Sequence, residues 1–123
     1  TVLLETTLYR ELGGFRDDLE IAEDYELWLR LTDSNSIGYI DEALITKRAG
    51  HAGQLSEKYG QIEIFRIRGL QNLVEQNYFT SKNQKLAEQE LAKKSRIYAA
   101  GCRKRTKIEE AEVYESLALK YEN

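Results

Sequence analysis

Several residue types are missing or scarce in this chain of 123 residues, and each absence narrows what the chain can be. There is no methionine and the chain begins at Thr1, so we expect it to be a piece of a longer protein. Proline is also absent, which suits a mostly helical chain because proline breaks helix interiors. Cys102 is the only cysteine, so no disulfide can form within the chain, and a reducing, cytoplasmic location fits best.

Charge and hydropathy argue against two further classes of protein. The net charge is −3, which gives no global electrostatic basis for binding nucleic acid. No apolar run approaches the roughly 20 residues that a membrane-spanning helix needs, and no signal or transit segment is recognisable. The hydrophobic share of 41% and the charged share of 32% are typical of a globular domain with a modest core.

The first part of the chain, residues 1–53, is expected to be mixed α/β. Apolar residues at helical spacing predict helices over 6–12 and 20–32. Gly13 would end the first helix in a left-handed conformation. Strands are expected over two further segments, which would form a short β-hairpin, 37–40 and 43–48.

The second part, residues 54–123, is expected to be a helical extension. The spacing of its apolar residues predicts three helices, over 56–78, 81–103 and 106 to about 121. Capping boxes would begin the last two, one formed by Ser81 with Gln84 and one by Thr106 with Glu109. These two helices are expected to form a helical hairpin.

An acidic pair, Glu23 and Asp24, stands at the head of the second predicted helix, just after a Gly-Gly-Phe turn at residues 13–15. The positive end of a helix dipole favours ionised carboxylates, and a well-oriented ionised carboxylate can act as a general base. The alternative is a solvent-exposed acid that only stabilises the helix, because helix N-termini favour acids in general. The neighbouring flexible turn favours a ligand site, since such turns often carry ligand-binding groups.

Two residues near the acidic pair have both a structural and a functional interpretation. Trp28 follows Asp24 by one turn and could stack on a sugar or a base, or pack between the helix and a sheet. Arg30 lies four residues after Glu26, where an exposed ion pair would contribute only about 0.3–0.5 kcal/mol.

His51, the only histidine, lies between Gly50 and Gly53 and just after Lys47 and Arg48. This mixture suits a phosphate or a metal–phosphate complex, because the two cations supply charge and the glycines let a loop close. The alternative is a surface or hydrogen-bonded histidine, since no second metal ligand lies nearby in the sequence.

Taken in order, these segments resemble the C-terminal half of family-2 glycosyltransferases. The resemblance covers about residues 1–56 and lies in four runs: 13–19 (GGFRDDL), 23–30 (EDYELWLR), 38–45 (GYIDEALI) and 47–51 (KRAGH). The helical remainder resembles the C-terminal extension of some bacterial members of that family.

The resemblance implies a GT-A fold, a Rossmann-like sheet with helices on both sides. It also implies transfer of a sugar from a nucleotide-sugar donor to a hydroxyl of a sugar or lipid-linked acceptor, with inversion. Asp24 would deprotonate that hydroxyl, Glu23 would help shape the site, and the turn at residues 13–15 would face the acceptor. His51 would help hold Mg²⁺ or Mn²⁺, or the donor diphosphate, and Arg48 would meet phosphate charge.

One motif of that family is missing, because no Asp-X-Asp sequence occurs in the chain. Without its metal-binding motif, we expect the chain alone to be inactive as a transferase. A truncated sheet would leave exposed edges, through which the chain could self-associate. The alternative to an enzyme is a helical protein-interaction module, suggested by the helical hairpin and its tyrosine-rich apolar faces.

Overall fold

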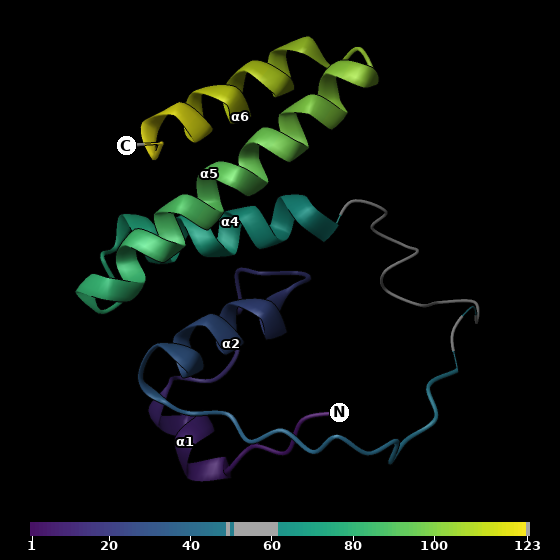
Figure 1. The fold of residues 1–123 in the computed structure, drawn as a ribbon, viewed down its shortest axis with the longest axis vertical. Coiled ribbons are helices and arrows are strands. Elements are labelled where there is room, and N and C mark those ends of the chain that lie inside the picture. The colour runs from purple at the N-terminus through teal and green to yellow at the C-terminus, as the bar shows by residue number, and fades with distance from the viewer. Residues whose placement is uncertain (49, 51–61, 123) are drawn as a thin grey trace.

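The structure is a computed structural model that describes residues 1–48, 50 and 62–122. Its helices are α1 (Thr6–Glu11), α2 (Glu23–Ser34), α4 (Ile62–Glu75), α5 (Ser81–Lys104) and α6 (Ile108–Lys120). Figure 1 shows that α5 and α6 run side by side as a hairpin, that α4 crosses α5, and that α2 lies against α4. Helix α2 therefore packs on α4, α4 packs on α5, and α5 packs on α6.

The helices follow the apolar periodicity of the sequence. α1 occupies the predicted segment, α2 begins three residues later than predicted, and the predicted α5–α6 hairpin is confirmed. The first residues of the helix expected over 56–78 lie outside the described residues, and its described part is α4. Periodicity identifies these elements because each helix buries one apolar stripe.

The predicted β-hairpin and Rossmann-like sheet are wrong, because the described part of the chain is helical and contains no strand. Residues 37–40 and 43–48 are exposed throughout, and their backbone bonds to no other described segment. In Figure 1 this stretch runs apart from the helices, beyond the end of α2. A strand needs a neighbouring strand to pair its N–H and C=O groups, and the sequence pattern alone does not supply that neighbour.

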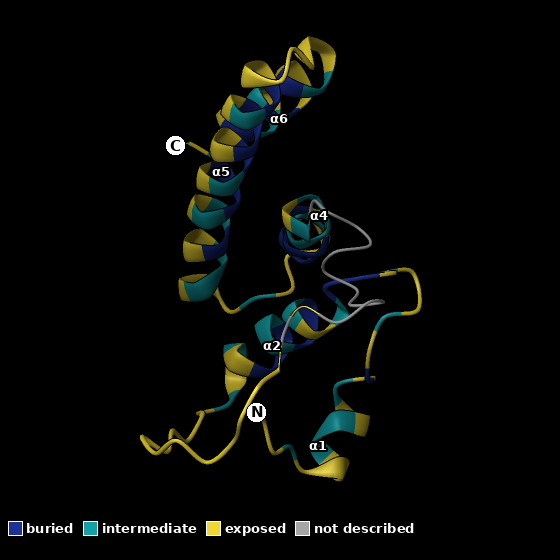
Figure 2. Cartoon of the chain, turned by 90° about the vertical axis from the view of Figure 1, so that its right-hand side faces the viewer, coloured by how far each residue is buried: buried dark blue, intermediate teal, exposed yellow. Residues whose placement is uncertain are grey.

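The hydrophobic core lies between α4, α5 and α6. The buried faces of these helices are turned toward one another in Figure 2. Tyr98 of α5 and Tyr114 of α6 meet edge to face, with ring centroids 4.6 Å apart. The core cluster consists of Ile67, Leu70, Val74, Ala87, Leu91, Tyr98, Ala99, Cys102, Ala111 and Tyr114. Cys102 therefore packs as a small apolar residue.

Helices α1, α4 and α5 end in the same way. The residue that follows each helix end by two positions has a left-handed backbone, with φ of 83° at Gly13, 50° at Asn77 and 59° at Thr106. The next N–H then donates to a carbonyl five residues back, at 2.9 or 3.0 Å. This Schellman arrangement satisfies carbonyls that the helix leaves unpaired. Thr106 is the costly member, because a β-branched residue is strained at positive φ.

Neither predicted capping box forms. α5 follows Thr80, whose side chain makes no capping bond, and the Gln84 amide instead donates to the carbonyl of Val74 at 3.0 Å. α6 begins after Lys107, again without a side-chain cap, and the hydroxyl of Thr106 donates to the adjacent carbonyl. The S/T-x-x-E/Q pattern is present in both places, but Ser81 is already the first residue of α5, and Thr106 has a left-handed backbone one residue before the N-cap of α6.

Asp33, near the end of α2, caps α5 from outside. Its carboxylate accepts hydrogen bonds from the backbone N–H of Thr80 at 3.1 Å, from the Thr80 hydroxyl at 3.1 Å and from the Asn83 amide at 2.8 Å. Partial burial would raise the pKa of Asp33, but the hydrogen bonds from Asn83 and Thr80 outweigh it and hold that pKa below its usual value. Asp33 therefore ties the end of α2 to the start of α5.

We predict that Asp33→Ala lowers the free energy of unfolding at pH 7 by about 1 kcal/mol, the usual effect of losing a helix cap. Because the folded-state pKa is depressed, this stability is complete above the unfolded pKa of about 3.9 and is lost as pH falls through the folded value. Urea denaturation of both proteins at pH 7 and near pH 2 measures the difference. Asp17→Ala, at an exposed position, is the control; equal stability of the Asp33 variant at pH 7 would contradict the prediction.

Candidate functional site

The Gly-Gly-Phe turn is built against the end of α1. Gly14 is buried, and a Cβ added there would lie 3.0 Å from the Tyr9 ring and hydroxyl. The N–H of Phe15 donates to that hydroxyl at 3.2 Å, and the two rings meet edge to face with centroids 5.5 Å apart. Gly14 thus lets the backbone approach Tyr9 closely at positive φ, which no larger residue does without strain.

The same turn is held from the other side by Arg30 of α2. The Arg30 guanidinium donates to the carbonyl oxygen of Gly14 at 2.6 Å and to that of Leu12. It also forms a forked pair with the Glu26 carboxylate, with Nε–Oε1 at 2.9 Å and Nη2–Oε2 at 2.7 Å. One side chain therefore satisfies two turn carbonyls and one carboxylate together.

The pair of Glu26 and Arg30 is buried and not exposed as the sequence suggested. Glu26 is 0% exposed and Arg30 is 7% exposed. α4 covers Glu26 at Gly69, where an added Cβ would lie 3.4 Å from the Glu26 Cβ. A small residue at this crossing lets the two helices approach, and it leaves room for the carboxylate beneath.

The acidic pair occupies the first turn of α2, as predicted. Ala22, just before it, has a left-handed backbone with φ of 64°. Asp24 is exposed, and its Oδ1 accepts a hydrogen bond from the N–H of Tyr25 at 2.7 Å. Glu23 is half-buried. Because Asp24 meets both solvent and the positive end of the helix dipole, it is suited to bind or deprotonate a group that approaches from solvent.

Two aromatic residues near the acidic pair are accessible. Phe15 is 45% exposed beside Tyr9, so it anchors the turn and still presents part of its ring to solvent. Trp28 is half-buried one turn after Asp24. The buried face of α2 is formed by Glu26, Leu27, Arg30 and Leu31. Trp28 therefore stands beside this face, where part of it can contact a ligand.

The remaining predicted site residues are not brought to the acidic pair. Arg48 is exposed, and no hydrogen bond or ion pair links it to a described residue. His51 and the predicted role for it lie outside the described residues. Across residues 1–48, 50 and 62–122, no three His, Cys, Asp or Glu side chains gather as a possible metal site.

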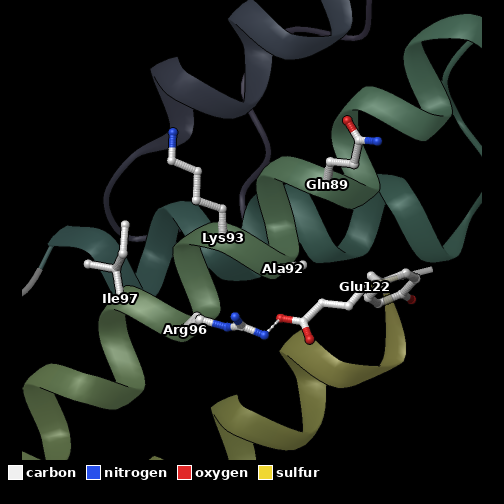
Figure 3. A pocket seen from close by; sticks show the side chains of 7 residues that line it. Gln89, Ala92, Lys93, Arg96, Ile97 and Glu122 are labelled. Carbon is white, nitrogen blue, oxygen red and sulfur yellow. Dashed lines mark hydrogen bonds and ion pairs between the residues drawn. The ribbon is translucent and has the colours of Figure 1, made fainter.

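The surface hollows lie on the helical part of the molecule. One, of about 650 Å³, is lined by Ile62 of α4 and by Lys93, Ile97 and Arg105 on and after α5. Another, of about 470 Å³, lies between α5 and α6, where Figure 3 shows Arg96 reaching toward Glu122. A third, of about 250 Å³, is lined by Tyr25 and Leu29 of α2, Leu70 of α4 and Leu86 of α5, and Glu23 and Asp24 line none of the three.

Comparisons with known proteins leave the family open: no protein-family model, no curated protein and no solved structure matches the chain. The resemblance to glycosyltransferases therefore stands on the sequence runs alone. Among the described residues, no helix is long and apolar enough to cross a membrane.

Sequence reasoning missed the buried clamp formed by Glu26 and Arg30. The spacing of four residues predicted their pairing, and the hydrogen bonds from the Arg30 guanidinium to the Glu26 carboxylate, at 2.9 and 2.7 Å, confirm it. Their burial depends on Gly14 and Gly69, which are far apart in the sequence. A glycine in the interior of a predicted helix, at position 69, was the available signal of a close approach.

We predict that Arg30→Met lowers the free energy of unfolding by about 3 kcal/mol or more, because it leaves Glu26 buried without a partner. Combining Arg30→Met with Glu26→Leu should recover much of that loss, since no charge then stays buried. Chemical denaturation measures both effects. Lys93→Ala, which breaks an exposed pair with Glu90, should change stability by less than about 0.5 kcal/mol. A single Arg30 variant as stable as this control would refute the clamp.

Proposed function

We propose that the chain is the acceptor-side part of an inverting glycosyltransferase, with Asp24 as the general base. The supporting observation is that the Gly-Gly-Phe turn and the helix that begins with Glu23 and Asp24 form one unit. Arg30 of α2 binds the carbonyl of Gly14, so turn and acids have a fixed relation. A general base needs such positioning before its pKa matters.

In the proposed reaction, a hydroxyl of the acceptor lies against Asp24 and gives its proton to the carboxylate. The hydroxyl oxygen attacks the anomeric carbon of the donor sugar from the face opposite the leaving group. The bond from that carbon to the diphosphate oxygen breaks, and the nucleoside diphosphate leaves with the bonding electrons. Attack from the opposite face inverts the anomeric carbon.

The other residues have supporting roles under this proposal. Phe15 and Trp28, which are both partly exposed, offer aromatic faces to a sugar ring. Glu23, next to the base, shapes the acceptor side. Arg48 and His51 are proposed to act on the donor diphosphate. Bound Mg²⁺ or Mn²⁺ would neutralise the charge of that diphosphate.

We predict that the 123-residue chain alone transfers no sugar. The sequence contains no Asp-X-Asp, the motif that holds the metal and with it the diphosphate in the family that the chain resembles. The measurement is release of nucleoside diphosphate from a panel of nucleotide sugars with sugar and lipid-linked acceptors. Product above the level of a heat-denatured sample would show that the chain holds a complete site.

We predict that Asp24→Asn, made in a complete transferase that contains this segment, lowers kcat by at least about 100-fold, the usual scale of general-base catalysis. Donor affinity, measured by calorimetry, should stay nearly unchanged because the donor lies on the other side of the reacting carbon. Asp17→Asn, an exposed acid outside α2, serves as the matched control. Unchanged turnover of the Asp24 variant would remove this residue from the mechanism.

A second candidate function is protein binding through the α5–α6 hairpin. It is favoured by the large apolar side chains that the hairpin exposes, which are Leu86, Ile97, Ile108, Val113 and Leu119. Deleting residues 81–123 would not test it, because Leu91 and Cys102 belong to the core. Replacing Ile97 by lysine keeps the core intact and separates the two functions: loss of a partner with sugar transfer retained indicates a binding hairpin.

A further inference from the structure

Residues 37–48 combine features that seldom occur together on a protein surface. They follow α2 as a stretch that is neither helix nor strand and bends once, at Glu42. No backbone hydrogen bond links them to another described residue. They also expose large apolar side chains, with Ile40 68% and Leu44 66% exposed. Unpaired backbone and exposed β-branched or aromatic residues are the properties of a strand that lacks its neighbour.

The charges of this stretch are arranged in a self-complementary order. Two acids, Asp41 and Glu42, come first, and two bases, Lys47 and Arg48, follow. An antiparallel partner with the same sequence therefore brings acids against bases at both ends. A parallel copy would instead bring each charge against its like, which is unfavourable.

We propose that two copies of the chain pair through residues 40–48 as antiparallel strands, with Leu44 of each copy at the two-fold axis. In this register Asp41 lies directly opposite Lys47 of the second copy. Glu42 lies diagonal to Arg48 of the second copy on the same face, within reach of long side chains. The two-fold axis produces each of these contacts twice.

The charges restrict where the axis can lie. An axis at Ala43 would place Asp41 opposite Ile45 and Lys47 opposite Tyr39, with Asp41 and Lys47 only diagonal to each other. An axis at Ile45 would place Glu42 opposite Arg48 but would set Ala43 opposite Lys47 and Leu44 opposite Thr46. An axis at Leu44 places Asp41 opposite Lys47, Ala43 opposite Ile45 and the two Leu44 side chains against each other, so it matches charge with charge and apolar residue with apolar residue.

The predicted dimer is dependent on concentration, because a two-stranded ribbon is only marginally stable by itself. It also leaves the helical core untouched, since residues 40–48 are exposed. Variants in this stretch should therefore change association without changing the helix content or thermal unfolding of the monomer. This separation does not depend on the proposed transferase function.

Charge reversal tests the pairing in the 123-residue chain, with association measured by sedimentation equilibrium over a concentration series. Asp41→Lys places lysine opposite lysine twice and should raise the dimer dissociation constant by roughly tenfold or more. Adding Lys47→Asp to it reverses both partners and should restore the original constant. Asp17→Lys makes the same change of net charge at an exposed position elsewhere and should have little effect.

A cross-link tests the register. Leu44→Cys places two thiols opposite each other, at a separation that suits a disulfide, and should give a covalent dimer under mild oxidation. Thr46→Cys lies on the same face but far from its own copy and should cross-link much more slowly. The native Cys102 is buried and should not interfere. A chain that stays monomeric at millimolar concentration, or a dimer that Asp41→Lys leaves unchanged, would overturn the proposal.

Discussion

The buried ion pair of Glu26 and Arg30 connects more of this molecule than any other contact near the N-terminus. It joins the middle of α2 to the turn after α1, through the carbonyl oxygens of Leu12 and Gly14. It also lies beneath α4 at Gly69. A buried pair is costly unless its hydrogen bonds are satisfied, and here the guanidinium has three acceptors. The turn, α2 and α4 therefore depend on one another.

This dependence explains why the acidic pair has a defined position although it faces solvent. Asp24 itself makes one short hydrogen bond, to the N–H that follows it. Its position is set by the burial of Glu26, two residues later in α2, and by the hydrogen bond from Arg30 to the carbonyl of Gly14. At the other end of α2, Asp33 binds the first turn of α5. The helix is thus fixed at its middle and at its C-terminal end, and Asp24 in its first turn stays exposed.

The sequence predicted what depends on local pattern and failed where distant partners decide. Helices α1, α2, α5 and α6 were predicted because one apolar stripe at helical spacing is a local property. The capping box predicted for α5 failed, and Asp33, far away in the sequence, binds the start of that helix instead. The Glu26–Arg30 spacing was recognised, but its burial depends on two distant glycines. The candidate acids could be placed at the start of α2, whereas their relation to Arg48 and His51 could not.

The failed strand prediction has a different origin from the failed caps. The short apolar runs at 37–40 and 43–45 are real, and so is the preference of isoleucine and tyrosine for extended backbone. What the chain does not provide among its described residues is a second strand. The N–H and C=O groups of a helix bond to each other, but those of a strand need partners on a neighbouring strand. A single extended stretch with exposed apolar side chains therefore gains little stability until a second strand pairs with it. Its sequence specifies a partner as much as it specifies a conformation, and that is why pattern alone overstated the sheet in this chain.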